Sequence, residues 1–212
     1  MSEPSKTYAP VVSVYEKLAP IYDWIYRGYL NGVFAVALDR LRLTGRERLL
    51  DIACGTGELE RRILAQHPDQ PMVGVDITEA MLARARAKCA GAPHIEFHRA
   101  ESQALPFPPG DFDIVVSCSA LHYMREPGRF FAEAARVLKP GGRFLLIDWS
   151  RDYFRGKFYN AWRSCCFRSH HRVYAQREVE TLLREADLTL THLHRFIVQW
   201  IWGMMCVEAR KT

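Results

Sequence analysis

The stretch LLDIACGTGELE, residues 49–60, decides the fold of this 212-residue chain. Its apolar start predicts a short buried strand that carries Asp51 near its carboxyl end, and the small residues from Ala53 to Gly57 predict a tight turn. The residues from Glu58 onward predict a helix. A strand, a glycine-rich turn and a helix form the unit with which an α/β sheet holds a nucleotide-like ligand at a helix N-terminus.

The charges of this turn discriminate between ligands. A dinucleotide site prefers G-x-G-x-x-G, but the third glycine, counted from Gly55, is replaced by Glu60. Asp51 and Glu58 add two more acids, and such a turn disfavours a pyrophosphate because like charges repel at short range. S-adenosylmethionine has an ammonium, a sulfonium and no phosphate. We therefore expect it as the cofactor and disfavour a nucleotide-binding oxidoreductase.

Length and composition limit the other possibilities. A chain of 212 residues with 49% hydrophobic and 25% charged residues is ordinary for one globular domain. A net charge of +5 permits nucleic acid or an anionic membrane as partner but predicts neither. The six cysteines show no C-x-x-C spacing, so a reduced, cytoplasmic protein without a metal site is expected. Neither a signal peptide nor an apolar run of the roughly 20 residues that span a bilayer is evident.

The rest of the chain alternates predicted strands and helices. One or two helices are expected over residues 11–42, further helices over 79–90 and 130–139, and an amphipathic helix over 177–188. Strands are expected over 71–78, 94–100, 112–118 and 143–150. We expect the Thr78 hydroxyl to cap the helix that follows it and Pro140 to stop the helix before it. This alternation indicates a doubly wound, mostly parallel sheet with helices on both faces. Residues 188–196 and 200–209 predict a closing antiparallel hairpin.

Two acids beyond the turn are candidate ligands of the cofactor. Asp76 lies 19 positions after Gly57, at the end of the second strand, where an acid accepts hydrogen bonds from ribose hydroxyls. Glu101 follows the third strand, with the Ser102 backbone beside it, and can accept from an adenine amino group. The alternatives are a helix N-terminal acid for Asp76, a solvated loop acid for Glu101 and a turn-stabilising acceptor for Asp51.

Four motifs in order carry a resemblance to a known family. They are LLDIACGTGELE, VGVDITEAML, AESQALPFPPGDFDIVVS and EAARVLKPGGRFLLID. Over residues 15–149 the chain resembles the class I S-adenosylmethionine-dependent methyltransferases, and within them the quinone-biosynthesis and small-molecule type. The resemblance implies a Rossmann-like, seven-stranded sheet with an antiparallel last strand.

The resemblance also implies which residues bind the cofactor. S-adenosylmethionine would lie on the turn, and Ser117 at the end of the fourth strand is assigned to the same site. Tyr22, with Tyr15 and Asp23 near it, would fold over the cofactor, where a ring face attracts the sulfonium; the alternative is the ordinary packing of an amphipathic helix. Ala53 replaces the first glycine of many members, and Glu101 replaces an aspartate. The implied set is Asp51, Ala53, Gly55, Gly57, Tyr22, Asp76, Ile77, Glu101, Ser102 and Ser117.

Methyl transfer needs little from the protein beyond positioning of the nucleophile and the methyl group. A catalytic base is needed only where the nucleophile must lose a proton. His122 follows the fourth strand and is the first candidate for a base or a substrate ligand; the alternative is a structural histidine. His170 and His171 are weaker candidates. Residues that could line the acceptor pocket are Tyr123, Asp148 and Tyr159.

Residues 151–177 hold seven Lys or Arg against one acid, with aromatic residues interleaved. They predict a cap for an acidic or amphipathic acceptor, or a peripheral contact with an anionic membrane; the alternative is a solvated basic face. We divide the single domain, residues 1–212, into an amino-terminal helical cap (1–45), a cofactor-binding core (46–150), a helical substrate cap (151–187) and a carboxyl-terminal hairpin (188–212).

These observations favour a methyltransferase that acts on a small apolar or amphipathic acceptor, such as a quinol-like molecule or a lipid headgroup. The alternatives are a non-catalytic S-adenosylmethionine-binding domain and a methyltransferase of RNA or protein. The chain has no added RNA-binding domain, and residues 117–120 are not an Asn-Pro-Pro-Tyr-type tetrapeptide, so no nucleic-acid partner is expected. The atom that is methylated and the oligomeric state are not readable from the sequence.

Overall fold

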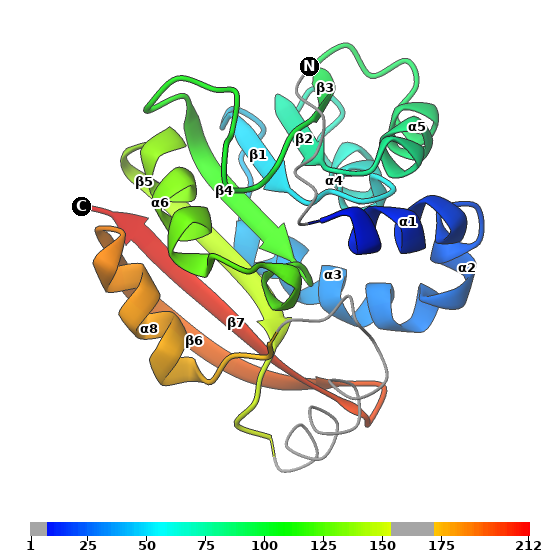
Figure 1. Cartoon of the computed structure of the whole chain (residues 1–212). Helices are drawn as coiled ribbons and strands as arrows, with labels where there is room; N and C mark the ends of the chain where they lie inside the picture. The colour runs from blue at the N-terminus through cyan, green and yellow to red at the C-terminus, as the bar shows by residue number, and fades with distance from the viewer. Residues whose placement is uncertain (1–7, 154–171) are drawn as a thin grey trace.

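The structure is a computed structural model, and it describes residues 8–153 and 172–212. Seven strands form one sheet in the order β3-β2-β1-β4-β5-β7-β6 (Figure 1). The first five strands pair in parallel, and β7 runs antiparallel to both of its neighbours, β5 and β6. The Rossmann-like sheet with an antiparallel last strand is therefore confirmed.

Three helices precede the first strand, and strands then alternate with helices. In chain order the elements are α1 (Ala9–Leu18), α2 (Tyr22–Ile25), α3 (Arg27–Leu41), β1 (Leu49–Ile52), α4 (Glu58–Leu64), β2 (Met72–Asp76), α5 (Glu79–Lys88), β3 (Ile95–Arg99), β4 (Phe112–Cys118), the short 3-10 helix η1 (Leu121–Tyr123), α6 (Pro127–Val137), β5 (Leu138–Trp149), α8 (Gln176–Glu185), β6 (Leu188–Val198) and β7 (Trp202–Lys211).

Strand residues divide between two apolar layers. Leu50 and Ile52 of β1 pack in the layer of α6 and α8, whereas Leu49 packs in the layer of α3 and α4. Val115 and Val116 of β4 divide between the same two layers. Because successive side chains of a strand point to opposite faces, a continuous apolar run is buried on both sides. Helices cover both faces of the sheet, as predicted.

The amino-terminal helices differ from the prediction of one or two helices over residues 11–42. The structure has three, because Pro20 cannot sit inside a helix and the chain leaves helical geometry again at Tyr26. α3 packs on a face of the sheet. Residues 8–25, which hold α1 and α2, lie instead over the ends of the strands and are called the lid below (Figure 1).

Two local predictions need correction. α6 ends at Val137 rather than at Pro140, because Leu138 is already extended, with ψ of 140°, and begins β5. Residues 139–142 bulge within β5. Thr78 stands at the N-cap of α5, but its side chain makes no capping hydrogen bond. It interacts with Asp76 instead, and its backbone N–H donates to Asp76 Oδ1 over 2.8 Å.

The predicted amphipathic helix and closing hairpin are present as α8, β6 and β7. α8 packs against α6 and the sheet, in the same apolar layer. Among the helices of residues 8–153 and 172–212, none has the length and apolar composition needed to cross a bilayer.

Candidate active site

A cavity lies where the carboxyl ends of three parallel strands meet the lid. Ile52, Asp76 and Cys118, the last residues of β1, β2 and β4, all line it. Ligands of open α/β sheets bind at this edge. The lid contributes Tyr8, Val11, Tyr15 and Tyr22, and the loops contribute Ala53, Gly55, Ile77, Thr78, Ala100, Glu101, Ser102, Ser119, Ala120, Tyr123 and Met124.

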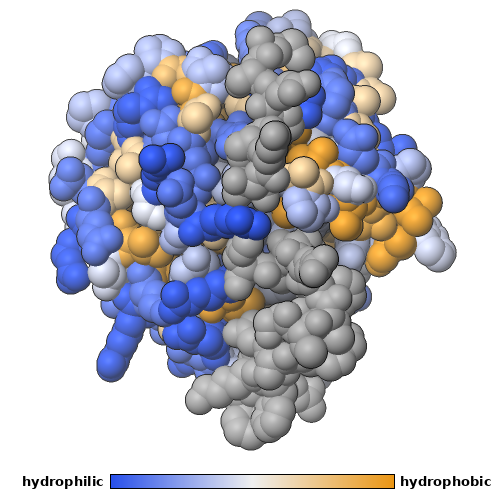
Figure 2. Space-filling model, viewed as in Figure 1, coloured by the Kyte–Doolittle hydropathy of each residue, from blue (hydrophilic) through white to orange (hydrophobic). Residues whose placement is uncertain are grey.

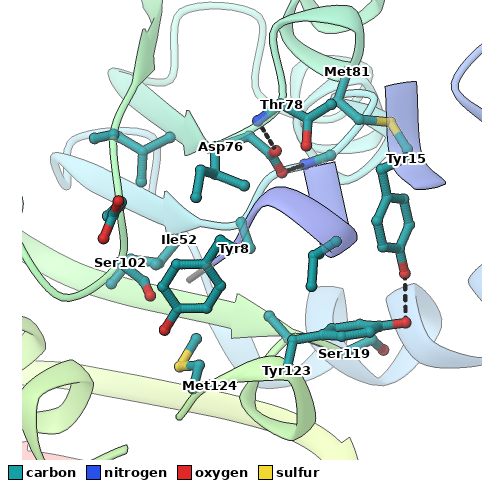
Figure 3. A pocket seen from close by; sticks show the side chains of 18 of the residues that line it. Tyr8, Tyr15, Ile52, Asp76, Thr78, Met81, Ser102, Ser119, Tyr123 and Met124 are labelled. Carbon is teal, nitrogen blue, oxygen red and sulfur yellow. Dashed lines mark hydrogen bonds between the residues drawn. The ribbon is translucent and has the colours of Figure 1, made fainter. Parts of the chain in front are cut away.

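Asp76 is held at the wall of this cavity by backbone donors. Its Oδ2 accepts the Gly55 N–H over 3.0 Å, and its Oδ1 accepts the Thr78 N–H (Figure 3). Burial raises the pKa of this carboxyl, and the backbone hydrogen bonds oppose that rise. Each carboxylate oxygen has two acceptor sites, so Asp76 can also accept hydroxyl groups from a ligand. It joins the glycine turn to the start of α5.

The turn itself has left-handed backbone geometry at three positions. Ala53, Gly55 and Gly57 have φ angles of 66°, 55° and 72°. A side chain on Gly57 would place its Cβ 2.8 Å from Ala85 of α5, so this glycine lets α4 and α5 pack closely. Gly57 does not line the cavity, whereas Ala53 does. Ala53 holds its conformation despite its Cβ, at a cost of about 1–2 kcal/mol.

The three acids of the turn do not face the cavity. The Glu58 carboxylate binds Arg61 over 2.8 Å and Arg62 over 2.9 Å. Burial would raise the pKa of Glu58, but these hydrogen bonds outweigh it and lower the pKa to about 2. Asp51 and Glu60 are buried behind the turn, 3% and 0% exposed. The predicted attraction of this turn for a cation therefore does not come from acids that line the site.

Negative charge reaches the cavity from two other carboxylates. Asp76 and Glu101 both line it, with Ile77 and Ser102 beside them. The structure thus brings together four residues that the sequence assigned to the ribose and adenine of a cofactor. Their role in binding stays a prediction.

The lid forms an aromatic wall opposite these residues. The Tyr15 and Tyr123 hydroxyls lie 2.6 Å apart, with ring centroids at 5.7 Å in an edge-to-face arrangement (Figure 3). The Tyr22 ring lies 5.9 Å from that of Tyr15, and the Tyr8 hydroxyl donates to Gln103 Oε1 over 2.8 Å. Burial raises the pKa of Tyr15 and Tyr22, so both hydroxyls keep their protons at neutral pH.

His122 is turned away from this cavity. Its Nδ1 lies 2.7 Å from Asp148 Oδ1, both side chains are 2% exposed, and its ring stacks on Trp149 with centroids 4.1 Å apart. Asp148 Oδ2 also accepts the Leu121 N–H over 2.7 Å. This geometry favours the structural alternative, in which a histidine and an aspartate fix the loop after β4. Asp148 does not line the cavity, but Tyr123 does.

Ser117 occupies a similar internal position. Its hydroxyl donates to the Ile52 carbonyl over 2.8 Å and is fully buried between β1 and β4. Ser119, two residues further on, lines the cavity instead and shares a 2.6 Å hydrogen bond with Tyr29. The predictions for Tyr159, His170 and His171, and for most of residues 151–177, lie outside the described residues.

The sequence contains a signal for two lining residues that were not predicted. Tyr8 and Val11 precede Tyr15 by seven and four positions, so all three fall on one face of a helix. That face meets the cavity rather than the apolar core. Met81, Ser119 and Met124 also line the cavity, and no sequence motif singles them out.

Comparison with known proteins shows which proteins this chain resembles. Residues 50–146 match the family model described as a methyltransferase domain. The ubiquinone/menaquinone biosynthesis C-methyltransferase UbiE of Geobacter sulfurreducens is 33% identical over 150 residues, 65% of this chain and 57% of that protein. A solved candidate methyltransferase from Bacillus halodurans C-125 has 27% identity and a TM-score of 0.73, covering 84% of this chain and 98% of its own.

Over residues 50–146 the chain is similar to methyltransferase domains, and its fold is that of the class I S-adenosylmethionine-dependent methyltransferases. It spans about half the length of the curated relatives that it matches. The fold is shared more widely: the [4+2]-cyclase SpnF has a TM-score of 0.78 at 19% identity, over 95% of this chain and 94% of its own. Fold alone therefore does not specify the reaction.

Proposed function

We propose that this protein transfers a methyl group from S-adenosylmethionine to a small apolar or amphipathic acceptor, of the quinol-like class. The observation that carries the proposal is the division of one cavity into two walls. Backbone turns and the carboxylates Asp76 and Glu101 form one wall, and the tyrosines of the lid form the other. A polar cofactor and an aromatic acceptor would meet between them.

The polar wall fits the parts of the cofactor. Ala53 and Gly55 would hold its methionine end, Asp76 its ribose hydroxyls, and Ile77 and Glu101 its adenine. The bound cofactor supplies a methyl group that its sulfonium already activates. Negative charge from Asp76 and Glu101 is compatible with this phosphate-free cation and unfavourable for a diphosphate.

The aromatic wall would orient the acceptor. Tyr15, Tyr22 and Tyr123 offer ring faces to an apolar acceptor, and the protonated hydroxyls of Tyr15 and Tyr22 can donate hydrogen bonds to its oxygen atoms. Positioning the nucleophile in line with the methyl group is the main contribution of such a site. The relatives named demethylmenaquinone methyltransferase and 2-phytyl-1,4-naphtoquinone methyltransferase support an acceptor of the quinone type.

The proposal is tested by cofactor binding and then by turnover. We expect S-adenosylmethionine or S-adenosylhomocysteine to raise the melting temperature and NAD to leave it unchanged. Incubation with methyl-labelled cofactor and separate extracts of membrane lipids and soluble metabolites should label the lipid extract. Stabilisation by NAD alone would overturn the cofactor assignment.

A reaction other than methyl transfer is the second candidate, because SpnF shows that this fold also supports a cyclisation. Both candidates predict cofactor binding, so turnover separates them. Consumption of S-adenosylmethionine with release of S-adenosylhomocysteine supports methyl transfer. Cofactor binding without consumption, across both extracts, would favour a non-methylating or non-catalytic role.

We also propose a peripheral contact with anionic membranes. The outward face of the lid exposes Val14, Ile21, Trp24 and Ile25 by 46–80%, and apolar atoms gather over α1 and α2 at the right of Figure 2. Exposed tryptophan and isoleucine side chains are suited to insertion at a lipid interface. The net charge of +5 favours attraction to anionic lipids. Flotation with anionic liposomes tests the contact; absence of bound protein would refute it.

A further inference from the structure

One ammonium group connects the lid to the glycine turn. Lys88, the last residue of α5, places its Nζ 2.7 Å from Asp23 Oδ2 in the lid and 2.9 Å from Thr56 Oγ1 in the turn. The Thr56 hydroxyl lies 2.6 Å from Asp23 Oδ1, so the three side chains close a ring of hydrogen bonds. Glu58 Oε2 lies 3.4 Å from the same ammonium.

This ring is shielded from solvent. Thr56 is 2% exposed, and the side chains of Lys88 and Asp23 are 17% and 26% exposed. An ion pair at a fully exposed position contributes little, because water screens it. Here both charges also make hydrogen bonds to the same hydroxyl, and hydrogen bonds to charged groups are the stronger ones.

The ring joins the two walls of the cavity. Asp23 follows Tyr22, which lines the cavity, and Thr56 follows Gly55, which lines it from the opposite side. The cavity between them has a volume of about 120 Å³. Sites for small molecules usually have roughly 300–1,000 Å³, so a cofactor with an acceptor needs more room than the closed lid leaves.

We propose that Lys88 and Asp23 form a latch that holds the lid closed on the glycine turn, and that this latch must open for ligands to enter. Both are positioning residues, since neither lines the cavity. The proposal rests on the proposed function only in naming the ligand as S-adenosylmethionine. The latch itself does not depend on which ligand the cavity takes.

Hydrogen–deuterium exchange of the full chain without ligand tests the latch. Lys88→Met should speed exchange of peptides from residues 9–25 by about tenfold or more, the effect of losing hydrogen bonds to a charged group. Peptides from α6 should not change. Lys88→Arg, which keeps the charge and the donors, should restore slow exchange, and Asp23→Asn should reproduce the loss.

The matched control is Lys139→Met. Lys139 binds both carboxylate oxygens of Asp113 over 2.8 Å, at the opposite edge of the sheet. It should leave exchange over residues 9–25 at the wild-type rate. Unchanged exchange of these residues in folded Lys88→Met, or an equal increase in the control, would overturn the latch.

Ligand kinetics provide a second readout. In Lys88→Met, S-adenosylhomocysteine should both associate and dissociate faster than in the wild type, because the lid opens more often. A change in dissociation alone would indicate a lost ligand contact and would contradict the latch. If the wild type fails to bind this ligand, the proposed function fails, while the exchange experiment still decides the latch.

Discussion

Glu60 is a fully buried acid whose removal should stabilise the protein at neutral and alkaline pH. The Glu60 carboxyl interacts with the Asp51 side chain and with its own backbone N–H, but neither of its oxygens reaches a partner at normal hydrogen-bond geometry among the described residues. Burial raises the pKa of Glu60 to about 7, and burial together with the charge of Glu60 raises the pKa of Asp51. The folded protein therefore retains a proton that the unfolded chain releases.

The sign and the size of the effect follow from this difference in pKa. Glu60 has an ordinary pKa of 4.5, so between about pH 4.5 and pH 7 the folded state binds more protons than the unfolded state. The free energy of unfolding falls as pH rises through this window, by at most about 3.5 kcal/mol at about 1.4 kcal/mol per unit. Glu60→Gln keeps the shape and removes the titration, so it should flatten this slope.

Urea unfolding at pH 5, 6, 7 and 8 measures the slope. We expect Glu60→Gln to be more stable than the wild type at pH 8 by about 2–3 kcal/mol and nearly equal to it at pH 5. Glu180→Gln, at an exposed position of α8, makes the same charge change and should leave the slope intact. A slope in Glu60→Gln equal to that of the wild type, or lower stability at pH 8, would refute the reasoning.

Two further substitutions test the site. Asp76→Ala removes the acceptor of the Gly55 and Thr78 N–H groups as well as the predicted ribose acceptor, and should raise the Kd for S-adenosylhomocysteine about 100-fold, or about 2.7 kcal/mol. Calorimetry with Asp76→Asn as the milder variant measures it, and an unchanged Kd would remove Asp76 from the site. His122→Ala leaves buried Asp148 without this partner and should lower the free energy of unfolding by about 1–3 kcal/mol. Turnover of His122→Ala, measured well below its melting temperature, tests whether His122 is a catalytic base. Retained turnover would show that it is not.

The sequence was sufficient to predict that the cavity lies at the carboxyl edge of the sheet. Strand and helix periods are local, and parallel strands bring their carboxyl ends to one edge, so the ends of β1 and β2 had to meet. Asp76 and Glu101 could be predicted on that edge for this reason. The hairpin of β6 and β7 followed from two apolar runs with a short connection.

The direction in which each side chain of a motif points could not be predicted from the sequence. The turn holds Asp51, Glu58 and Glu60, yet one is bound by arginines and two are buried behind the turn. Ser117 and Ser119 are two residues apart, and only Ser119 lines the cavity. The left-handed backbone at Ser119, with φ of 58°, breaks the strand alternation that would have placed both on one face.

By itself the sequence determined the strand, turn and helix of residues 49–60, the placing of helices on both faces of the sheet and the edge at which the cavity lies, because these depend on local spacing and on apolar burial. Only the tertiary structure decided which groups meet across that edge. Tyr15 reaches Tyr123 across 108 positions, and Lys88 reaches Asp23 from another helix. These contacts depend on how the lid packs over the sheet, and the packing of one helix on a distant loop leaves no periodic signal in the chain.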